Sequence, residues 1–144
     1  AGTLSGNPVT VAAGLATLEI ISQPEFYSEL NFINEKLISG LLDLAKAANI
    51  GFQAHHVGGL FGFLFCNEGE VYNYQQVKSA NQIFFKEFFH RMLAEGIYFS
   101  PSAFESGFIS SAHEVQEINL TLAAAERVFH KLKCKQESAS LIHA

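Results

Sequence analysis

The sequence has 144 residues, of which 49% are hydrophobic and 16% are charged, and its formal net charge is -5. This length is enough for one domain with a hydrophobic core of its own, and the negative charge argues against a nucleic-acid-binding protein, which needs basic patches. No apolar segment approaches the roughly 20 residues that cross a bilayer, and no basic and then apolar leader opens the sequence, so neither a membrane span nor a signal peptide is expected.

The composition is rich in phenylalanine, with 14 copies, and contains no tryptophan. Two explanations remain open: an aromatic core, or an apolar surface that something outside this chain covers. The two cysteines, Cys66 and Cys134, have neither the spacing of a metal site nor a partner pattern. We expect reduced thiols in a cytoplasmic protein.

The first 14 residues, AGTLSGNPVTVAAG, predict a turn of small residues that leads into a helix. Asn7 stands at the position of an N-cap, and Pro8 follows where a missing N–H costs nothing. Apolar residues at helical spacing then predict a helix over residues 8–21. A glycine-containing turn at a helix N-terminus presents N–H groups and a positive dipole end to an anion, most often a phosphate. On spacing alone, an ordinary helix entry remains the alternative.

A second helix and a hairpin are expected next. The segment Ser22-Gln23-Pro24-Glu25 has the form of a capping box, and apolar residues then recur every three or four positions until Asn49 and Gly51. Residues 52–66 form two short apolar runs around a glycine pair, which predicts an antiparallel hairpin. Its adjacent histidines, 55 and 56, would face opposite sides of a strand, so we expect no shared metal ion there.

The second half of the chain alternates in the same way. A polar loop is expected over residues 67–74, and then a helix that starts at the capping box Ser79-Ala80-Asn81-Gln82 and ends at Gly96. Two strands, over residues 97–99 and 107–110, are expected on either side of a loop over 100–106. A last helix should run from Val115 to about Leu132. The resulting order predicts an α+β fold, in which helices cover a small antiparallel sheet of about four strands.

Several segments resemble the glutamate-1-semialdehyde 2,1-aminomutases, which are pyridoxal-phosphate enzymes of the ornithine-type (class-III) aminotransferase group. GTLSGNPVTVAAG is similar to the family's GTLSGNP-x-x-x-AAG, and SPSAFESGF and SAH…AAAERV also match. The resemblance covers residues 2–132. It implies the C-terminal portion of a fold-type I enzyme, with residues 1–22 from the large cofactor-binding domain, 23–135 as the small domain and 136–144 as a frayed tail.

The resemblance also implies roles for individual residues. In the family, the Gly-Thr pair reaches across the dimer interface to the cofactor phosphate of the other subunit, and the matching residues here are Gly2 and Thr3. The family's S-x-FE-x-GF motif carries an active-site acid, which corresponds to Glu105. Among phenylalanines, this acid is a candidate proton carrier or electrostatic partner of a substrate amine, with a solvated loop acid as the alternative. Relatives that bind an α-carboxylate commonly have an arginine in this region.

The implied activity of the intact enzyme is an intramolecular amino transfer that converts glutamate-1-semialdehyde to 5-aminolevulinate for tetrapyrrole (porphyrin) synthesis. It implies pyridoxal 5'-phosphate and pyridoxamine 5'-phosphate as cofactor forms, a homodimer, and a location in the cytoplasm, or in the plastid of a plant. No lysine lies in a motif that matches the family's cofactor lysine, so we expect this chain alone to be inactive. Two alternatives remain: another class-III aminotransferase, and a non-catalytic relative that dimerises or binds phosphate ligands.

Overall fold

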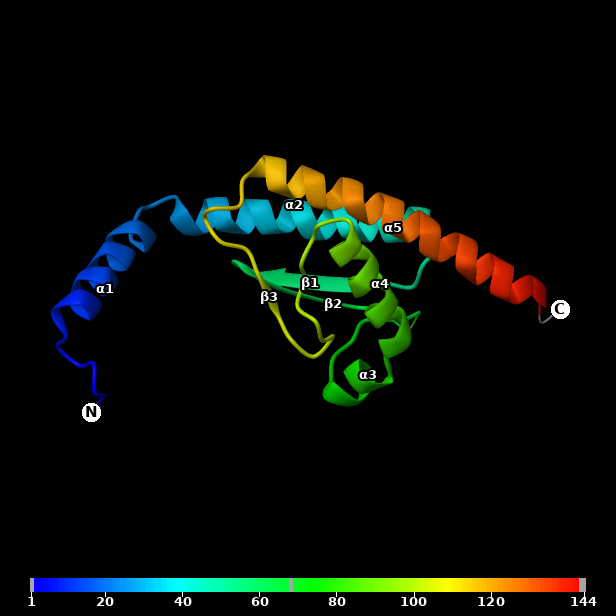
Figure 1. Ribbon diagram of the computed structural model, residues 1–144, viewed down its shortest axis with the longest axis horizontal. Coiled ribbons are helices and arrows are strands. Elements are labelled where there is room, and N and C mark those ends of the chain that lie inside the picture. The colour runs from blue at the N-terminus through cyan, green and yellow to red at the C-terminus, as the bar shows by residue number, and fades with distance from the viewer. Residues whose placement is uncertain (1, 68, 143–144) are drawn as a thin grey trace.

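The computed structural model describes residues 2–67 and 69–142, and side chains as far as residue 136. Helices α2 (Phe26–Ala47) and α5 (Val115–Ile142) lie side by side and run in the same direction over a small antiparallel sheet, while α1 extends away from this body as an arm (Figure 1). The predicted α+β class is confirmed.

Helix α1 (Pro8–Ile21) has the bounds that the sequence predicts. The side-chain oxygen of Asn7 accepts hydrogen bonds from the N–H groups of Val9 (3.0 Å) and Thr10 (3.2 Å), so the predicted cap is confirmed. None of the residues of α1 is buried. The helix therefore depends on its cap and on intrinsic helix propensity, because packing within this chain contributes little.

The predicted capping box at the start of α2 is wrong. The N-cap is Glu25, and no side chain caps the helix. The N–H of Ser22 donates to the carbonyl oxygen of Leu18 (3.0 Å), so Ser22 completes the last turn of α1 and cannot cap the next helix. At the other end, Asn49 adopts a positive φ of 56° and stops α2, as expected of a C-terminal breaker.

The sheet consists of β1 (Gln53–Val57), β2 (Leu60–Leu64) and β3 (Gly107–Phe108), in the order β1-β2-β3 with antiparallel pairing. The hairpin around the glycine pair is confirmed. The described residues form three strands rather than about four, because residues 97–99 stay attached to the end of the preceding helix. The Ile97 N–H donates to the carbonyl oxygen of Met92 (2.9 Å), and the Phe99 side chain enters the core.

Helix α3 (Tyr74–Ser79) was not predicted, and α4 (Gln82–Ala94) begins differently from the prediction. Asn81, not Ser79, caps α4: its side-chain oxygen accepts from the Phe84 N–H at 2.9 Å. The Ser79 hydroxyl instead donates to the Gln76 carbonyl oxygen within α3 (2.8 Å). Gly96, at φ 86°, ends α4 as predicted, because only a residue without Cβ adopts this conformation without strain.

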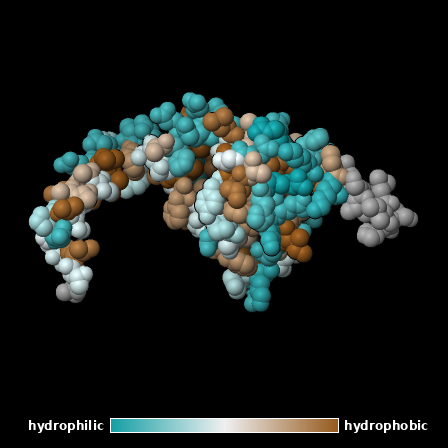
Figure 2. Space-filling model, in the orientation of Figure 1, coloured by the Kyte–Doolittle hydropathy of each residue, from teal (hydrophilic) through white to brown (hydrophobic). Residues whose placement is uncertain are grey.

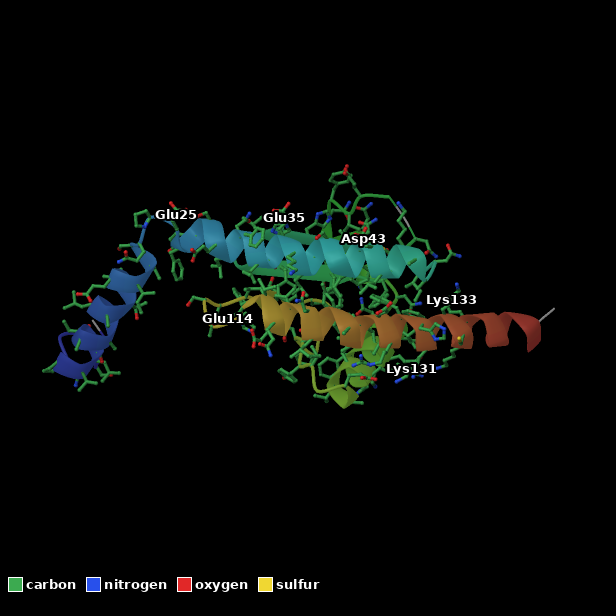
Figure 3. All side chains as sticks on the ribbon, turned by 90° about the horizontal axis from the view of Figure 1, so that it is seen from above. Glu25, Glu35, Asp43, Glu114, Lys131 and Lys133 are labelled. Carbon is green, nitrogen blue, oxygen red and sulfur yellow. The ribbon has the colours of Figure 1, made fainter. Side chains whose placement is uncertain are left out.

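Helix α5 extends to Ile142, so residues 136–142 continue the helix, and the expected fraying beyond Lys135 stays a prediction. This segment contains neither glycine nor proline, and nothing in its sequence stops a helix. Residues 143 and 144 of the expected tail lie outside the described part. Figure 3 shows α2 and α5 from above, with Lys131 on the side of α5 that faces α4, where it pairs with Glu95 (2.9 Å).

The core between the sheet and the helices is aromatic. Phe63 contacts Phe85, Phe88 and Phe99, and Phe88 in turn packs against Phe129. Most of the phenylalanine surplus is therefore core, and the buried members are Phe61, Phe63, Phe65, Phe85, Phe88, Phe89, Phe99 and Phe129. Other phenylalanines, such as Phe32, Phe104 and Phe108, remain exposed on this chain.

Candidate functional site

In the N-terminal turn, the N–H and the hydroxyl of Thr3 are available as hydrogen-bond donors to a ligand. The Ser5 N–H donates to the Gly2 carbonyl oxygen (3.0 Å) and the Gly2 N–H donates to the Ser5 hydroxyl (3.2 Å), which closes the turn. Among residues 2–67 and 69–142, the N–H and the hydroxyl of Thr3 form no hydrogen bond, and Thr3 is exposed. Because Asn7 occupies the donors of the first turn of α1, the turn rather than the helix terminus can bind an anion.

Glu105 lies in the loop of residues 100–106, which hydrogen bonds between loop residues close. The Ser100 hydroxyl donates to the Ser106 carbonyl oxygen (3.1 Å), and the Glu105 N–H donates to the carbonyl oxygen of Ser102 (3.1 Å). The Phe104 N–H donates to the Ser102 hydroxyl (3.2 Å). The Glu105 side chain is exposed.

A cavity of about 330 Å³ lies beside Glu105. Loop 100–106, helix α3 and one face of the sheet form its walls, with Tyr74 and Val77 from α3 and His55 and Gly62 from the strands. A carboxylate at the edge of a largely apolar cavity attracts a cationic group and repels a second carboxylate. The arrangement suits a ligand that presents an amine rather than a carboxylate at this point.

The structure does not bring the three predicted site residues together. Gly2 and Thr3 lie at the far end of the α1 arm, whereas loop 100–106 belongs to the body (Figure 1). The arm carries exposed apolar side chains, which include Val9, Leu15 and Leu18 (Figure 2). A site that used the N-terminal turn and Glu105 of the same chain is therefore inconsistent with this arrangement.

Sequence reasoning missed Tyr74, whose ring contacts that of Phe104 with the centroids 6.2 Å apart. The signal was present in the residues before it. Asn73 caps α3 by accepting from the Gln76 N–H (3.0 Å), and the Gln76 side chain accepts from the Tyr72 N–H (2.8 Å). A polar N-cap followed three residues later by glutamine is the pattern of a helix start.

The adjacent histidines of the hairpin lie on opposite faces of the sheet. His55 and His56 occupy successive positions of β1, opposite Gly62 and Phe61, and so face opposite sides of the sheet. The described residues contain no group of three or more His, Cys, Asp or Glu side chains that could hold a metal ion. Within that same part of the chain, no helix is long and apolar enough to span a bilayer.

Residues 1–122 match the family model described as aminotransferase class-III. The chain belongs to the class-III aminotransferase family. Over 133 residues it is 50% identical to the glutamate-1-semialdehyde 2,1-aminomutase of Legionella pneumophila (strain Corby), and the alignment covers 92% of this chain but 31% of that relative. The chain thus spans about a third of the length of the curated relative it matches.

Solved structures of transaminases share the fold. An ω-transaminase from Sphaerobacter thermophilus superposes with a TM-score of 0.73 at 21% identity, covering 90% of this chain and 29% of the other. A transaminase with PLP bound superposes equally well, with a TM-score of 0.73 at 18% identity, covering 94% of this chain and 30% of the other. At these identities the similarity establishes the fold alone.

Proposed function

We propose that this chain is the C-terminal portion of an aminomutase that converts glutamate-1-semialdehyde to 5-aminolevulinate in tetrapyrrole synthesis. The observation that carries the proposal is the 50% identity, over 92% of the chain, to a protein of that name. Glu105 adds chemical support, because an acid at the cavity edge disfavours substrates with a carboxylate at the reacting end. The same residue distinguishes the proposal from other class-III aminotransferases.

Thr3 and the N-terminal turn fit a phosphate group. Thr3 contributes an N–H and a hydroxyl that no other described group uses, in an exposed turn of small residues that a phosphoryl group can approach closely. Pyridoxal phosphate, when bound, supplies the electron sink for amino-group chemistry. We propose that Gly2 and Thr3 hold its phosphate in the partner subunit of a homodimer, since the arm carries them away from their own Glu105 (Figure 1).

We propose that this chain has no aminomutase activity by itself. Such chemistry needs a lysine that reaches the cofactor, and all lysines of the chain lie on helices. Lys131 and Lys135 form ion pairs with Glu95 and Glu87, and no lysine lines the cavity beside Glu105 among the described residues. The reacting lysine would then belong to the rest of the intact enzyme.

The test is the dependence of the intact enzyme on an amino acceptor. Purified enzyme, given glutamate-1-semialdehyde alone, should form 5-aminolevulinate without any added keto acid, and the 144-residue chain with added cofactor should form none. A strict requirement for an external keto acid would instead identify an ordinary class-III aminotransferase. Turnover by the chain alone would contradict the proposed role of a lysine outside it.

A further inference from the structure

Helix α3 and the Glu105 loop meet through one aromatic pair. The rings of Tyr74 and Phe104 lie with their centroids 6.2 Å apart and their planes inclined by 46°, within the range of attractive aromatic pairs. Tyr74 is 66% exposed and Phe104 is 51% exposed, so neither ring is held by burial in the core. Phe104 immediately precedes Glu105, so a displacement of the main chain at Phe104 also displaces Glu105.

Among the described residues, the hydrogen bonds of the loop hold the main chain at Phe104 and Glu105 but neither of their side chains. Among the described residues, the three hydrogen bonds of residues 100–106 join loop residues to one another. Ala103 packs against the core, which attaches the middle of the loop to the body. Within the described part of the chain, the ring of Phe104 contacts one other aromatic ring, that of Tyr74 in α3.

Hydrogen bonds at both ends of α3 connect this helix to its surroundings. Its start is capped by Asn73, and just beyond its end the Asn81 N–H donates to the carbonyl oxygen of Phe65 (2.8 Å). That bond connects the chain after α3 to the residue that follows β2, the central strand, whose residues Gly62, Phe63 and Leu64 line the cavity. Tyr74 and Val77 face the same cavity as Glu105.

We propose that Tyr74 is a positioning residue for Glu105: its ring holds Phe104, and thereby keeps the neighbouring carboxylate at the edge of the 330 Å³ cavity. The inference rests on the proposed function, in which Glu105 contacts the substrate. Without the ring, the loop samples other conformations, and a small displacement of a contacting group lowers the rate strongly.

The first test measures the loop directly. Amide hydrogen exchange of the peptide that covers residues 100–106 in the intact enzyme should be faster in Tyr74→Ala than in the wild type, and unchanged in Tyr74→Phe, which keeps the ring. Tyr98→Ala is the matched control, since Tyr98 is also exposed (71%) and also contacts a phenylalanine, Phe89. Unchanged exchange of this peptide in Tyr74→Ala would overturn the inference.

The second test uses kinetics. Tyr74→Ala should lower kcat about threefold to tenfold, the range expected from the loss of one aromatic pair, with KM nearly unchanged, and Tyr74→Phe should restore the rate. In a Glu105→Gln background, Tyr74→Ala should cause no further loss, because both changes remove the same positioned carboxylate. Additive losses would overturn the inference.

The two tests separate this inference from the proposed function. A Glu105→Gln enzyme with wild-type kcat would contradict the role of Glu105 in the proposed function, and the inference with it. An impaired Glu105→Gln enzyme, combined with an unaltered loop and rate in Tyr74→Ala, would contradict the role of Tyr74 alone.

Discussion

The side-chain amide of Asn34, on α2, donates a hydrogen bond to the main-chain oxygen of Gly58 (2.8 Å), at the turn of the β1–β2 hairpin. The same nitrogen donates to the oxygen of Leu60 (3.0 Å). Asn34 is fully buried, and its own side-chain oxygen has no partner among the described residues. By binding both oxygens, this buried side chain attaches the hairpin to the helix that covers it.

Replacing Asn34 should therefore destabilise the chain more than replacing an exposed asparagine. Asn34→Leu removes the side-chain donor to the two turn oxygens, and we predict a loss of about 1–3 kcal/mol in the free energy of unfolding. Asn34→Asp should cost more, because it also buries a charge. The control is Asn119→Ala on the exposed side of α5, which should stay within about 0.5 kcal/mol. Urea denaturation measures all three, and equal stabilities would contradict this role.

Gly107 in β3 tolerates no side chain. It pairs with Phe61 of β2, and a Cβ at this position would collide with the Phe61 ring, which is buried and packs against Phe99. We predict that Gly107→Ala lowers the free energy of unfolding by about 1–3 kcal/mol, the usual cost of overpacking.

The matched control for this change is Gly14→Ala in α1. A Cβ at Gly14 meets no atom within 4 Å, and alanine favours a helix over glycine by about 1 kcal/mol. Gly14→Ala should therefore leave the stability of the body unchanged and increase the helix content seen by circular dichroism. A stable Gly107→Ala chain would show that β3 can move away from β2 without cost.

Acid should weaken the contact between α4 and α5. Hydrogen bonds from Lys135, and then from Arg91, hold the pKa of Glu87 below its ordinary value, and those from Lys131 and Arg127 do the same for the pKa of Glu95. A depressed folded-state pKa gives stability that is present above the unfolded-state pKa and is lost as the pH falls through the folded value. The urea concentration at the midpoint of unfolding should therefore decrease as the pH falls below about 4.3, the ordinary pKa of glutamate.

The variant that tests this pH dependence is the double change Glu87→Gln and Glu95→Gln. It should flatten the acid limb of the stability profile, whereas Glu19→Gln on α1 should leave that limb unchanged. An unaltered acid limb in the double variant would assign the acid sensitivity to other carboxylates. High salt at neutral pH should reduce the difference between the variants, because these pairs are partly exposed.

Helix α1 should be much less protected than helix α2 in the chain studied alone. It has no buried residue, whereas α2 buries Leu37, Ile38 and Leu41. Amide hydrogen exchange should be fast throughout α1 and slow in the middle of α2. Asn7→Ala should weaken α1 by about 1 kcal/mol without affecting α2, because it removes the cap alone. Equal protection of the two helices would indicate a cover for α1 within the chain.

The sequence predicted correctly those helix ends and turns that depend on particular residues at particular positions. The Asn7-Pro8 pair defined the start of α1, and the glycine pair at 58 and 59 defined the hairpin, because caps and tight turns need particular residues. Gly96 ended α4 for the same reason.

The errors arose where tertiary packing decides between equivalent patterns. Ser22 and Ser79 both match a capping box, but each belongs to the end of the preceding helix. The apolar run 97–99 has the composition of a strand. Only the fold reveals that these residues form no strand and that the Phe99 side chain enters the core. For the candidate site, the sequence indicated Thr3 and Glu105, but not that the arm separates them or that Tyr74 contacts the Glu105 loop.

The proposed role of Gly2 and Thr3 in the N-terminal turn is to hold the cofactor phosphate of a partner subunit. The most direct measurement is the distance from the Thr3 hydroxyl oxygen to the nearest phosphate oxygen in a crystal structure of the intact enzyme with pyridoxal phosphate bound. We predict about 3 Å, a hydrogen-bond distance, to a phosphate bound in the other subunit. A Thr3 that lies beyond hydrogen-bond reach of every cofactor phosphate would contradict the account.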